Sequence, residues 1–329
     1  MFNNELWQKP AGGAGGANFY THQIANSCRF NRANVSRMTR ALGTATANTK
    51  WTISTWVKPV GFSSDERHFM GGTGSTNGLG LGFRNIGSEL CQLAYLDNPT
   101  SGIQTYIFTQ KSFRDPSAWY HIVVNQDTTL GTASDRIKIY INGELQTAFN
   151  PVSSGGGTTP YYPSQNSATI NDSIHTLIVG GNSSNNIATS FDGYLAETYF
   201  IDGTAYAGSD FAETKNGVWI PKDASGLTFG NNGFYLNYAS SGDLGNDVSG
   251  NNNDWTANNL SSSDQMLDSP TFGSSSSGNF CTWNPLIYNA QSLSEGDCRF
   301  DGQTNNRSAY GNFGLAIGSK YYVEFLMLV

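Results

Sequence analysis

The chain has 329 residues and a formal net charge of −7, and only 13% of its residues are charged. Its 38 glycines and 13% aromatic residues favour short strands joined by tight turns. Lys and Arg form no cluster that could neutralise a phosphate backbone, and no apolar run reaches the roughly 20 residues of a membrane span, so we expect neither nucleic-acid binding nor membrane insertion.

Residues 1–27 open the chain and include the glycine-rich stretch AGGAGGA at 11–17. The first residues have neither the basic start nor the apolar run of a signal peptide, which predicts synthesis in the cytosol. Glycine at this density supports neither a helix nor a core. The segment is therefore predicted to be either a disordered leader or an arm that orders only against a partner chain, with Phe2, Leu6 and Trp7 as apolar anchors.

Strand-length apolar runs, each closed by a turn signal, fill residues 28–222. These runs are 51–59, 79–83, 91–96, 105–109, 119–127, 135–145, 175–181 and 191–203. In one of them Ile137, Ile139 and Ile141 share a face, and Asn142-Gly143 supplies a tight hairpin turn. The sequence therefore predicts an all-β fold of two packed antiparallel sheets.

Residues after the predicted sandwich are less regular. SDFAETK, at 209–215, opens with a cap signal and is the one stretch that predicts a turn or two of helix. Residues 223–278 are rich in Asn, Ser and Gly and are predicted to connect the sandwich to a small additional β segment at 279–329.

Five motifs occur in a fixed order along the β-rich region: WTISTWVKP, AWYHIVVNQD, IKIYINGEL, LIVGG and FDGYLAETYFIDG. Together they resemble the laminin-G-like branch of the concanavalin A-like lectin and glucanase superfamily, over about residues 27–222. The resemblance implies a concanavalin A-like antiparallel β-sandwich, a jelly roll.

Three later stretches resemble large virion proteins of tailed bacteriophages, particularly marine ones: FAETKNGVWIPKD (211–223), GFYLNYASSGDLGNDVSGNNNDWTANNL (233–260) and NFCTWNPL (279–286). Residues 284–329 resemble the opening strands of a SPRY-type β-sandwich, which the chain ends too early to close. The resemblance implies a virion structural protein of the tail, fibre or capsid surface, with other virion proteins as partners. A receptor-binding lectin for host surface polysaccharide is the alternative.

The stretch FDGYLAETYFIDG contains three acidic residues. Glucanases of the superfamily cleave with two carboxylates that share one face of a strand. Strict alternation puts Asp192 and Glu197 on opposite faces, and it gives Glu197 the apolar neighbours Phe191, Leu195 and Tyr199. Glu197 is therefore expected to satisfy backbone donors near a strand end, while Asp192 and Asp202 each precede Gly and indicate turns. No catalytic pair is predicted, and we expect a protein that is not an enzyme.

The stretch DLGNDVSGNNND, at 243–254, is the strongest candidate for a metal site. Its hard oxygen ligands would come from Asp243, Asn246, Asp247, Asn251 and Asp254. The stretch lacks the central Gly and the closing Glu of the helix-loop-helix calcium motif. We therefore expect an Asx-rich turn and no cofactor, with calcium as the alternative.

Cysteine and histidine show no metal-ligand spacing. The cysteines, Cys28, Cys91, Cys281 and Cys298, are far apart and are expected to be free thiols. The histidines are scattered, and those within predicted strands, His121 and His175, are expected to be satisfied by hydrogen bonds in the sheet.

Aromatic side chains offer candidate sugar-binding positions. Trp56 lies on the strand face opposite Trp51 and Ile53, where a sugar ring could stack, and Tyr161, Tyr162 and Trp255 are comparable loop candidates. The alternative for Trp56 is a second core layer of the sandwich.

The chain ends on YYVEFLMLV, a strand-like run with apolar residues on both faces. A free edge of this kind promotes aggregation. We therefore expect Phe325 and Leu326 to anchor assembly of a homo-oligomer, with a trimer favoured.

Overall fold

The computed structural model describes most of the chain. The described residues are 19–60, 67–73, 78–86, 89–98, 105–151, 153–154, 157–158, 160–168, 171, 175–182, 187–272, 277–286, 293–301 and 308–313. Within these ranges the secondary structure is strands and short 3-10 helices, with no α-helix. The anchors predicted at Phe2, Leu6, Trp7, Phe325 and Leu326 lie outside the described residues.

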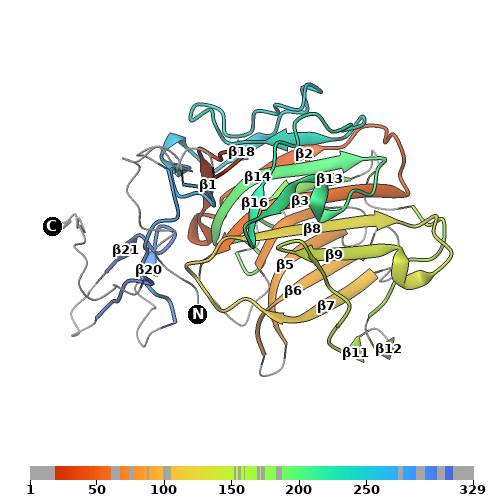
Figure 1. Cartoon of the computed structure of the whole chain (residues 1–329), viewed down its shortest axis with the longest axis horizontal. Helices are drawn as coiled ribbons and strands as arrows, with labels where there is room; N and C mark the ends of the chain where they lie inside the picture. Colours follow the sequence, from red (N-terminus) through yellow and green to blue (C-terminus); the bar gives the residue numbers. More distant parts are fainter. Residues whose placement is uncertain are drawn as a thin grey trace.

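Sheet A has eight strands in the order β10-β9-β8-β3-β14-β1-β19, with β17 also paired to β14 (Figure 1). The ladders of this sheet are antiparallel. Its strands are β1 (Ser27–Phe30), β3 (Lys50–Pro59), β8 (Tyr120–Asp127), β9 (Ile137–Ile141), β10 (Glu144–Leu145), β14 (Gly193–Asp202), β17 (Phe234–Leu236) and β19 (Gln265–Met266).

Sheet B has seven antiparallel strands in the order β18-β2-β13-β4-β5-β6-β7. Its strands are β2 (Arg37–Ala41), β4 (Arg67–Thr73), β5 (Gly78–Ile86), β6 (Glu89–Asn98), β7 (Thr105–Ser112), β13 (Thr176–Val179) and β18 (Thr256–Asn258). The two sheets pack face to face, which confirms the predicted all-β antiparallel sandwich.

Three short hairpins and four 3-10 helices complete the described structure. The hairpin strands are β11 (Ser153–Ser154), β12 (Gly157–Thr158), β15 (Ala212–Lys215), β16 (Val218–Pro221), β20 (Leu293–Ser294) and β21 (Arg299–Phe300). The 3-10 helices are η2 (Arg32–Asn34), η3 (Ala133–Asp135), η4 (Gly208–Asp210) and η5 (Ser262–Asp264). The helix predicted at 209–215 is thus wrong beyond η4, because those residues pair with β16 instead.

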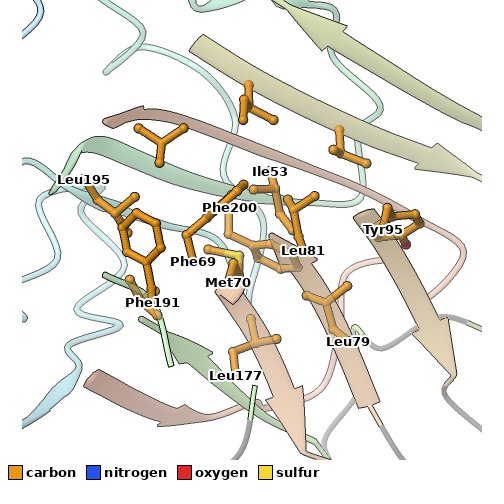
Figure 2. Close-up of a cluster of buried hydrophobic side chains, with 14 of the residues drawn as sticks. Ile53, Phe69, Met70, Leu79, Leu81, Tyr95, Leu177, Phe191, Leu195 and Phe200 are labelled. Carbon is orange, nitrogen blue, oxygen red and sulfur yellow. The ribbon is translucent and has the colours of Figure 1, made fainter. Parts of the chain in front are cut away.

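The main core lies between the sheets, where period-two alternation turns one face of each strand inward. Figure 2 shows side chains from both sheets meeting there, among them Ile53, Leu81 and Phe200. The alternation of Ile137, Ile139 and Ile141 is confirmed, since all three are buried in this core. The predicted hairpin turn after them is confirmed as well, with φ of 49° at Asn142 and 80° at Gly143.

Sheet A is covered on its outer face too. The hairpin β15–β16, residues 20–26 and parts of 224–266 pack over it in two further apolar clusters. Every residue of β14 is buried in consequence. The outer face of sheet B is largely buried as well, since Gln92, Ala94, Tyr106 and Phe108 on it are at most 6% exposed.

Residues 223–278 differ from the predicted connecting segment. They contribute β17 and β19 to sheet A and β18 to sheet B, and they bury Phe234 and Trp255 in the main core. The sandwich therefore extends well beyond the boundary predicted at residue 222.

The predicted N-terminal arm also differs within its described part. Ile24 is 1% exposed and exchanges hydrogen bonds with the Thr271 hydroxyl at 2.8 and 3.1 Å. Residues 19–26 are thus held by their own chain, and the prediction that the arm orders only against a partner is wrong for them. Beyond the sandwich, β20 and β21 form a small hairpin that projects at the left of Figure 1.

Candidate functional site

The outer face of sheet B is shaped by β5, β6 and β7. On β5 the inward side chains are Leu79, Leu81 and Phe83, so Gly80, Gly82 and Arg84 face outward. On β6 and β7, Ala94, Tyr106 and Phe108 form an apolar cluster on this outer face, with Leu96 and Tyr161 packed against it. We call Arg84, Gln92, Leu96, Tyr106, Phe108 and Tyr161 the Arg84 patch.

Arg84 is positioned by the rings of the patch. Its Nη1 donates a hydrogen bond to the Tyr106 hydroxyl, and its guanidinium carbon lies 5.7 Å from the centre of the Phe108 ring. The two rings pack edge to face, with centres 4.4 Å apart. Tyr161 joins them because its backbone pairs with that of Tyr106 through hydrogen bonds of 3.0 and 3.1 Å. A planar cation held in this way is oriented before any ligand arrives.

Gln92 adds a polar group with no partner. It is fully buried and lies opposite Arg84 in the β5–β6 register, and neither its amide nitrogen nor its amide oxygen has a hydrogen-bond partner. Buried amides are almost always hydrogen-bonded, and because Gln92 is 0% exposed, an ordered water is the partner that fits this one. His68 lies over Gly80 on the same face, and burial, together with the charge of Arg84, lowers the pKa of His68 to about 4, although a hydrogen bond with Asn182 opposes the shift.

Two of the four predicted sugar-binding aromatics are covered. Trp56 is 5% exposed and stacks on His121 with ring centres 4.8 Å apart, and Trp255 is 4% exposed and packs edge to face on Phe234. Neither ring offers a face to a sugar in this structure, so Trp56 lies in the second core layer that was its alternative. Tyr161 belongs to the Arg84 patch.

Tyr162, the fourth predicted aromatic, is half-buried against the main core. It lies outside the Arg84 patch. The patch itself was missed by the sequence analysis because Arg84 and Gln92 stand on different strands, and only the β5–β6 register brings them together.

The His121 ring, which stacks on Trp56, is itself held by two hydrogen bonds. The Trp219 indole donates to its Nδ1 at 3.1 Å, which leaves Nε2 to donate to the Ser54 hydroxyl at 2.9 Å. Burial lowers the pKa of His121 to about 3, so the ring is neutral. This buried histidine is satisfied by hydrogen bonds, as predicted.

Glu197 lies on a β-bulge that the sequence analysis missed. The register of β14 shifts between Ala196 and Tyr199, and Glu197 has a φ of 50°. The extra residue places Glu197 and Tyr199 together on the outer face, while Phe191 and Leu195 stay in the core. Strict alternation was therefore right about Tyr199 and wrong about Phe191 and Leu195.

The Glu197 carboxylate accepts hydrogen bonds from side chains and not from the predicted backbone donors. The hydroxyls of Tyr199 and Tyr235 donate to it, the latter at 2.6 Å, and His22 Nε2 lies 3.5 Å away. Asp192 has different surroundings, among them Arg32 and Arg67. The two carboxylates do not share a site.

The predicted metal-binding loop is closed by its own hydrogen bonds. Asp247 accepts four of them, from the N–H groups of Tyr235, Ser249 and Asn253 and from the Ser249 hydroxyl, at 2.8 to 2.9 Å. Asp254 Oδ1 accepts from the Asp247 N–H at 2.9 Å.

Of the other predicted ligands, Asn251 donates its amide to the carbonyls of Gly230 and Gly233, and Asp243 and Asn246 lie in the turn before Asp247. The Asp247 carboxylate is thus engaged by donors of its own chain. In the described part of the chain, no three His, Cys, Asp or Glu side chains are grouped to hold a metal ion. The four cysteines are free thiols, as predicted.

Two large antiparallel sheets packed face to face around one core make up a β-sandwich. The chain belongs to the concanavalin A-like lectin/glucanases superfamily, whose laminin-G-type family model matches residues 37–206. This confirms the superfamily indicated by the ordered motifs. No curated protein sequence matches the chain significantly.

Solved structures share parts of the fold. A heptameric pentraxin from Limulus polyphemus is 17% identical over 57% of this chain and 80% of its own, with a TM-score of 0.41. A candidate carbohydrate-binding protein from Bacteroides ovatus is 14% identical over 73% of this chain and 61% of its own, with a TM-score of 0.44.

Tailspike protein 2 of an Escherichia coli O157:H7 bacteriophage is 17% identical over 56% of this chain, with a TM-score of 0.35. The match covers 23% of the tailspike chain, well under two thirds of its length. Among the described residues, no helix has the length and apolarity that crossing a membrane requires.

Proposed function

We propose that this chain is a carbohydrate-recognition module of a tailed-bacteriophage particle and that the sugar binds at the Arg84 patch. The observation that carries the proposal is the guanidinium of Arg84, oriented by Tyr106 and Phe108 and partly exposed like Tyr161 beside it. Sugar hydroxyls are suited to planar polar groups of this kind, while the C–H face of the ring packs on aromatic carbons such as those of Tyr161.

The virion setting is supported by the resemblance of residues 211–223, 233–260 and 279–286 to phage proteins. We propose a position on the tail, fibre or capsid surface. Immunogold labelling of purified particles with antibody against the chain tests this setting, and unlabelled particles from a producing culture would contradict it.

We propose binding without cleavage. Both hydroxyl donors and His22 engage the Glu197 carboxylate, so its own chain occupies it, and Asp223, whose charge also acts on His22 and Tyr235, is an exposed carboxylate. Release of reducing ends from laminarin, agarose or host capsular polysaccharide by the purified chain would overturn this.

Binding is tested by titrating the full chain with bacterial surface polysaccharides. Arg84→Ala and Tyr161→Ala should each weaken binding about tenfold or more, a loss of about 1.4 kcal/mol. Tyr310→Ala is the matched control, because Tyr310 is an aromatic residue that is 56% exposed outside the patch. If both patch variants bind as the wild type does while a glycan is bound, the site lies elsewhere.

An assembly role is the second candidate, and exposed apolar side chains favour it. In the C-terminal part of the described chain, large apolar residues are 38% to 56% exposed: Leu267, Phe272, Phe280, Leu286, Tyr310 and Phe313. Exposed apolar side chains that gather in one patch mark protein interfaces, and we propose such a patch here. We propose that this part contacts another virion protein or a second copy, with a trimer as the first candidate. A monomer in light scattering at micromolar concentration, together with particles that lose nothing on Phe272→Ser and Phe280→Ser substitution, would contradict the assembly role.

A further inference from the structure

The turn Glu295–Asp297 docks the C-terminal segment against sheet A. Its three residues are all in the left-handed region, with φ of 56° at Glu295, 66° at Gly296 and 59° at Asp297. Glycine tolerates this region, but residues with side chains rarely occupy it in succession. Contacts from outside the turn must therefore hold this conformation.

Side chains of the sandwich hold the turn, and Asn31 is one of them, because its amide donates to the Glu295 carboxylate at 3.5 Å. Tyr194 of β14 donates its hydroxyl to the Gly296 carbonyl at 2.6 Å, and Arg29 of β1 forms an ion pair with the Glu295 carboxylate at 3.0 Å. The fit is close, because a Cβ atom on Gly296 would lie 2.4 Å from the Tyr194 hydroxyl oxygen. A few polar contacts thus decide whether the turn stays docked.

Asp297 enters this interface with an unsatisfied oxygen. The residue is 5% exposed, and its Oδ2 has no hydrogen-bond partner. The positive charge of Lys58 favours the ionised form of Asp297 without a direct hydrogen bond. The three N–H groups of the Lys58 ammonium already bind Asp268 at 2.8 Å, Asn279 at 2.9 Å and the Phe280 carbonyl at 3.0 Å. An ionised carboxylate at 297 would be buried without a partner of its own.

Asp192, which immediately precedes β14, acts on the same junction through its charge. Burial raises the pKa of Asp192 to about 6, with Glu295 adding to the shift and Arg32 and Arg67 opposing it. Burial also raises the pKa of Asp297 to about 8, with the Asp192 charge adding to the shift and the lysine ammonium opposing it. The two carboxyl groups therefore destabilise each other's ionised form.

We propose that the turn Glu295–Asp297 is a proton-operated latch, docked while Asp297 and Asp192 carry protons and released when both are ionised. A protonated carboxyl is neutral and tolerates burial, whereas two carboxylates repel each other and regain water on release. Release would break the contacts of the turn with Tyr194 and Arg29 and so detach this part of the C-terminal segment from the sandwich.

The direction follows from proton linkage. In the released segment Asp297 returns to its ordinary pKa of 3.8, below that of the docked state. The released form therefore binds fewer protons, and docking weakens as pH rises from about 4 until the docked carboxyl is itself ionised. Each pH unit in this window shifts the docking equilibrium about tenfold.

Hydrogen exchange of the full chain, corrected for the intrinsic effect of pH on amide exchange, tests the latch. Protection of residues 293–300 should fall about tenfold per unit between pH 5 and pH 8, while β3 and β14 keep theirs. Asp297→Asn retains the shape but cannot ionise, so its turn should stay protected at both pH values. Asp135→Asn, an exposed carboxylate of η3, should keep the wild-type pH dependence.

A wild-type turn with the same protection at pH 5 and pH 8 would overturn the proposal, and so would an Asp297→Asn turn that opens with pH as the wild type does. Should Asp297→Asn fail to fold, Asp192→Asn provides the second test. Without the Asp192 charge, the turn should be better protected at pH 8 than in the wild type, and an unchanged profile contradicts the latch.

Discussion

Lys58 is fully buried, and its charge joins segments that are far apart in the sequence. Besides the two acceptors from residues 279 and 280, its ammonium binds Asp268 at 2.8 Å, and the other Asp268 oxygen accepts from the Trp119 indole at 2.8 Å. Burial raises the pKa of Asp268, and Lys58 opposes that shift. A buried pair of this kind is costly to form and more costly to break on one side.

Replacing Lys58 with Met should therefore destabilise the fold strongly. The substitution leaves the Asp268 carboxylate buried without its cation, at a cost of about 3 to 5 kcal/mol. Lys58→Met combined with Asp268→Leu removes both charges and should regain most of this loss. Urea unfolding followed by fluorescence measures both. A single variant as stable as the wild type would show that the pair contributes little.

Glu197 shows why the sequence alone could not predict residue-level chemistry. The stretch LAETYF reads as a regular strand, and only the bulge at Glu197 brings its carboxylate beside Tyr199 on the outer face. Tyr235 comes from a strand 38 residues further on, and His22 from the N-terminal segment. A local sequence pattern cannot predict contacts between residues so far apart in the sequence.

At the scale of elements, residues 19–26 behave as a strap over sheet A. Ile24 packs with Trp56 and Tyr194, and the Thr21 hydroxyl donates to Glu213 of β15 at 2.7 Å. His22 adds a contact that depends on pH. The Glu197 carboxylate, 3.5 Å from Nε2, raises the pKa of His22, while burial acts in the opposite direction.

Because the pKa of His22 is raised in the folded chain, its ion pair stabilises the strap below the ordinary pKa of 6.5, and this contribution is lost as pH rises through the raised value. His22→Ala should therefore loosen residues 19–26 at pH 5.5 and have little effect at pH 8.5. Hydrogen exchange of this segment at the two pH values measures the difference. Equal loosening at both values would mean that His22 acts by packing alone.

Strands were predictable where the local pattern agrees with the tertiary contacts. The runs at 51–59 and 119–127 became β3 and β8 within a residue at their ends, because alternating apolar residues line the main core. The helix predicted at 209–215 failed for the opposite reason. Ala212 is buried over sheet A, and pairing with β16 outweighs the cap signal.

At the scale of the whole molecule, the sandwich is completed by residues far beyond its strand-rich sequence. Composition predicted that residues 223–278 form a linker, because Asn, Ser and Gly dominate them. The few apolar residues among them are well placed, however, and the polar ones cap turns, as Asp247 does with four hydrogen bonds. Residues 223–278 take their place through contacts with strands far away in the sequence, and local sequence patterns do not predict such contacts.

A chain that ends at residue 222 should therefore fail to fold stably. It lacks β17, β18 and β19 together with a set of buried side chains: Phe229, Phe234, Leu236, Tyr238 and Trp255. At about 2 kcal/mol for each side chain, their loss approaches the 5 to 15 kcal/mol that stabilises a typical domain.

A chain that ends at residue 286 is the matched comparison, because it keeps these side chains and all three acceptors of Lys58. It should give one cooperative urea transition, whereas the shorter chain should expose its tryptophans and aggregate through the free edges of β14 and β2. Circular dichroism and fluorescence distinguish the two outcomes. A shorter chain that unfolds at the same urea concentration as the longer one would show that residues 223–278 only connect, as their composition suggests.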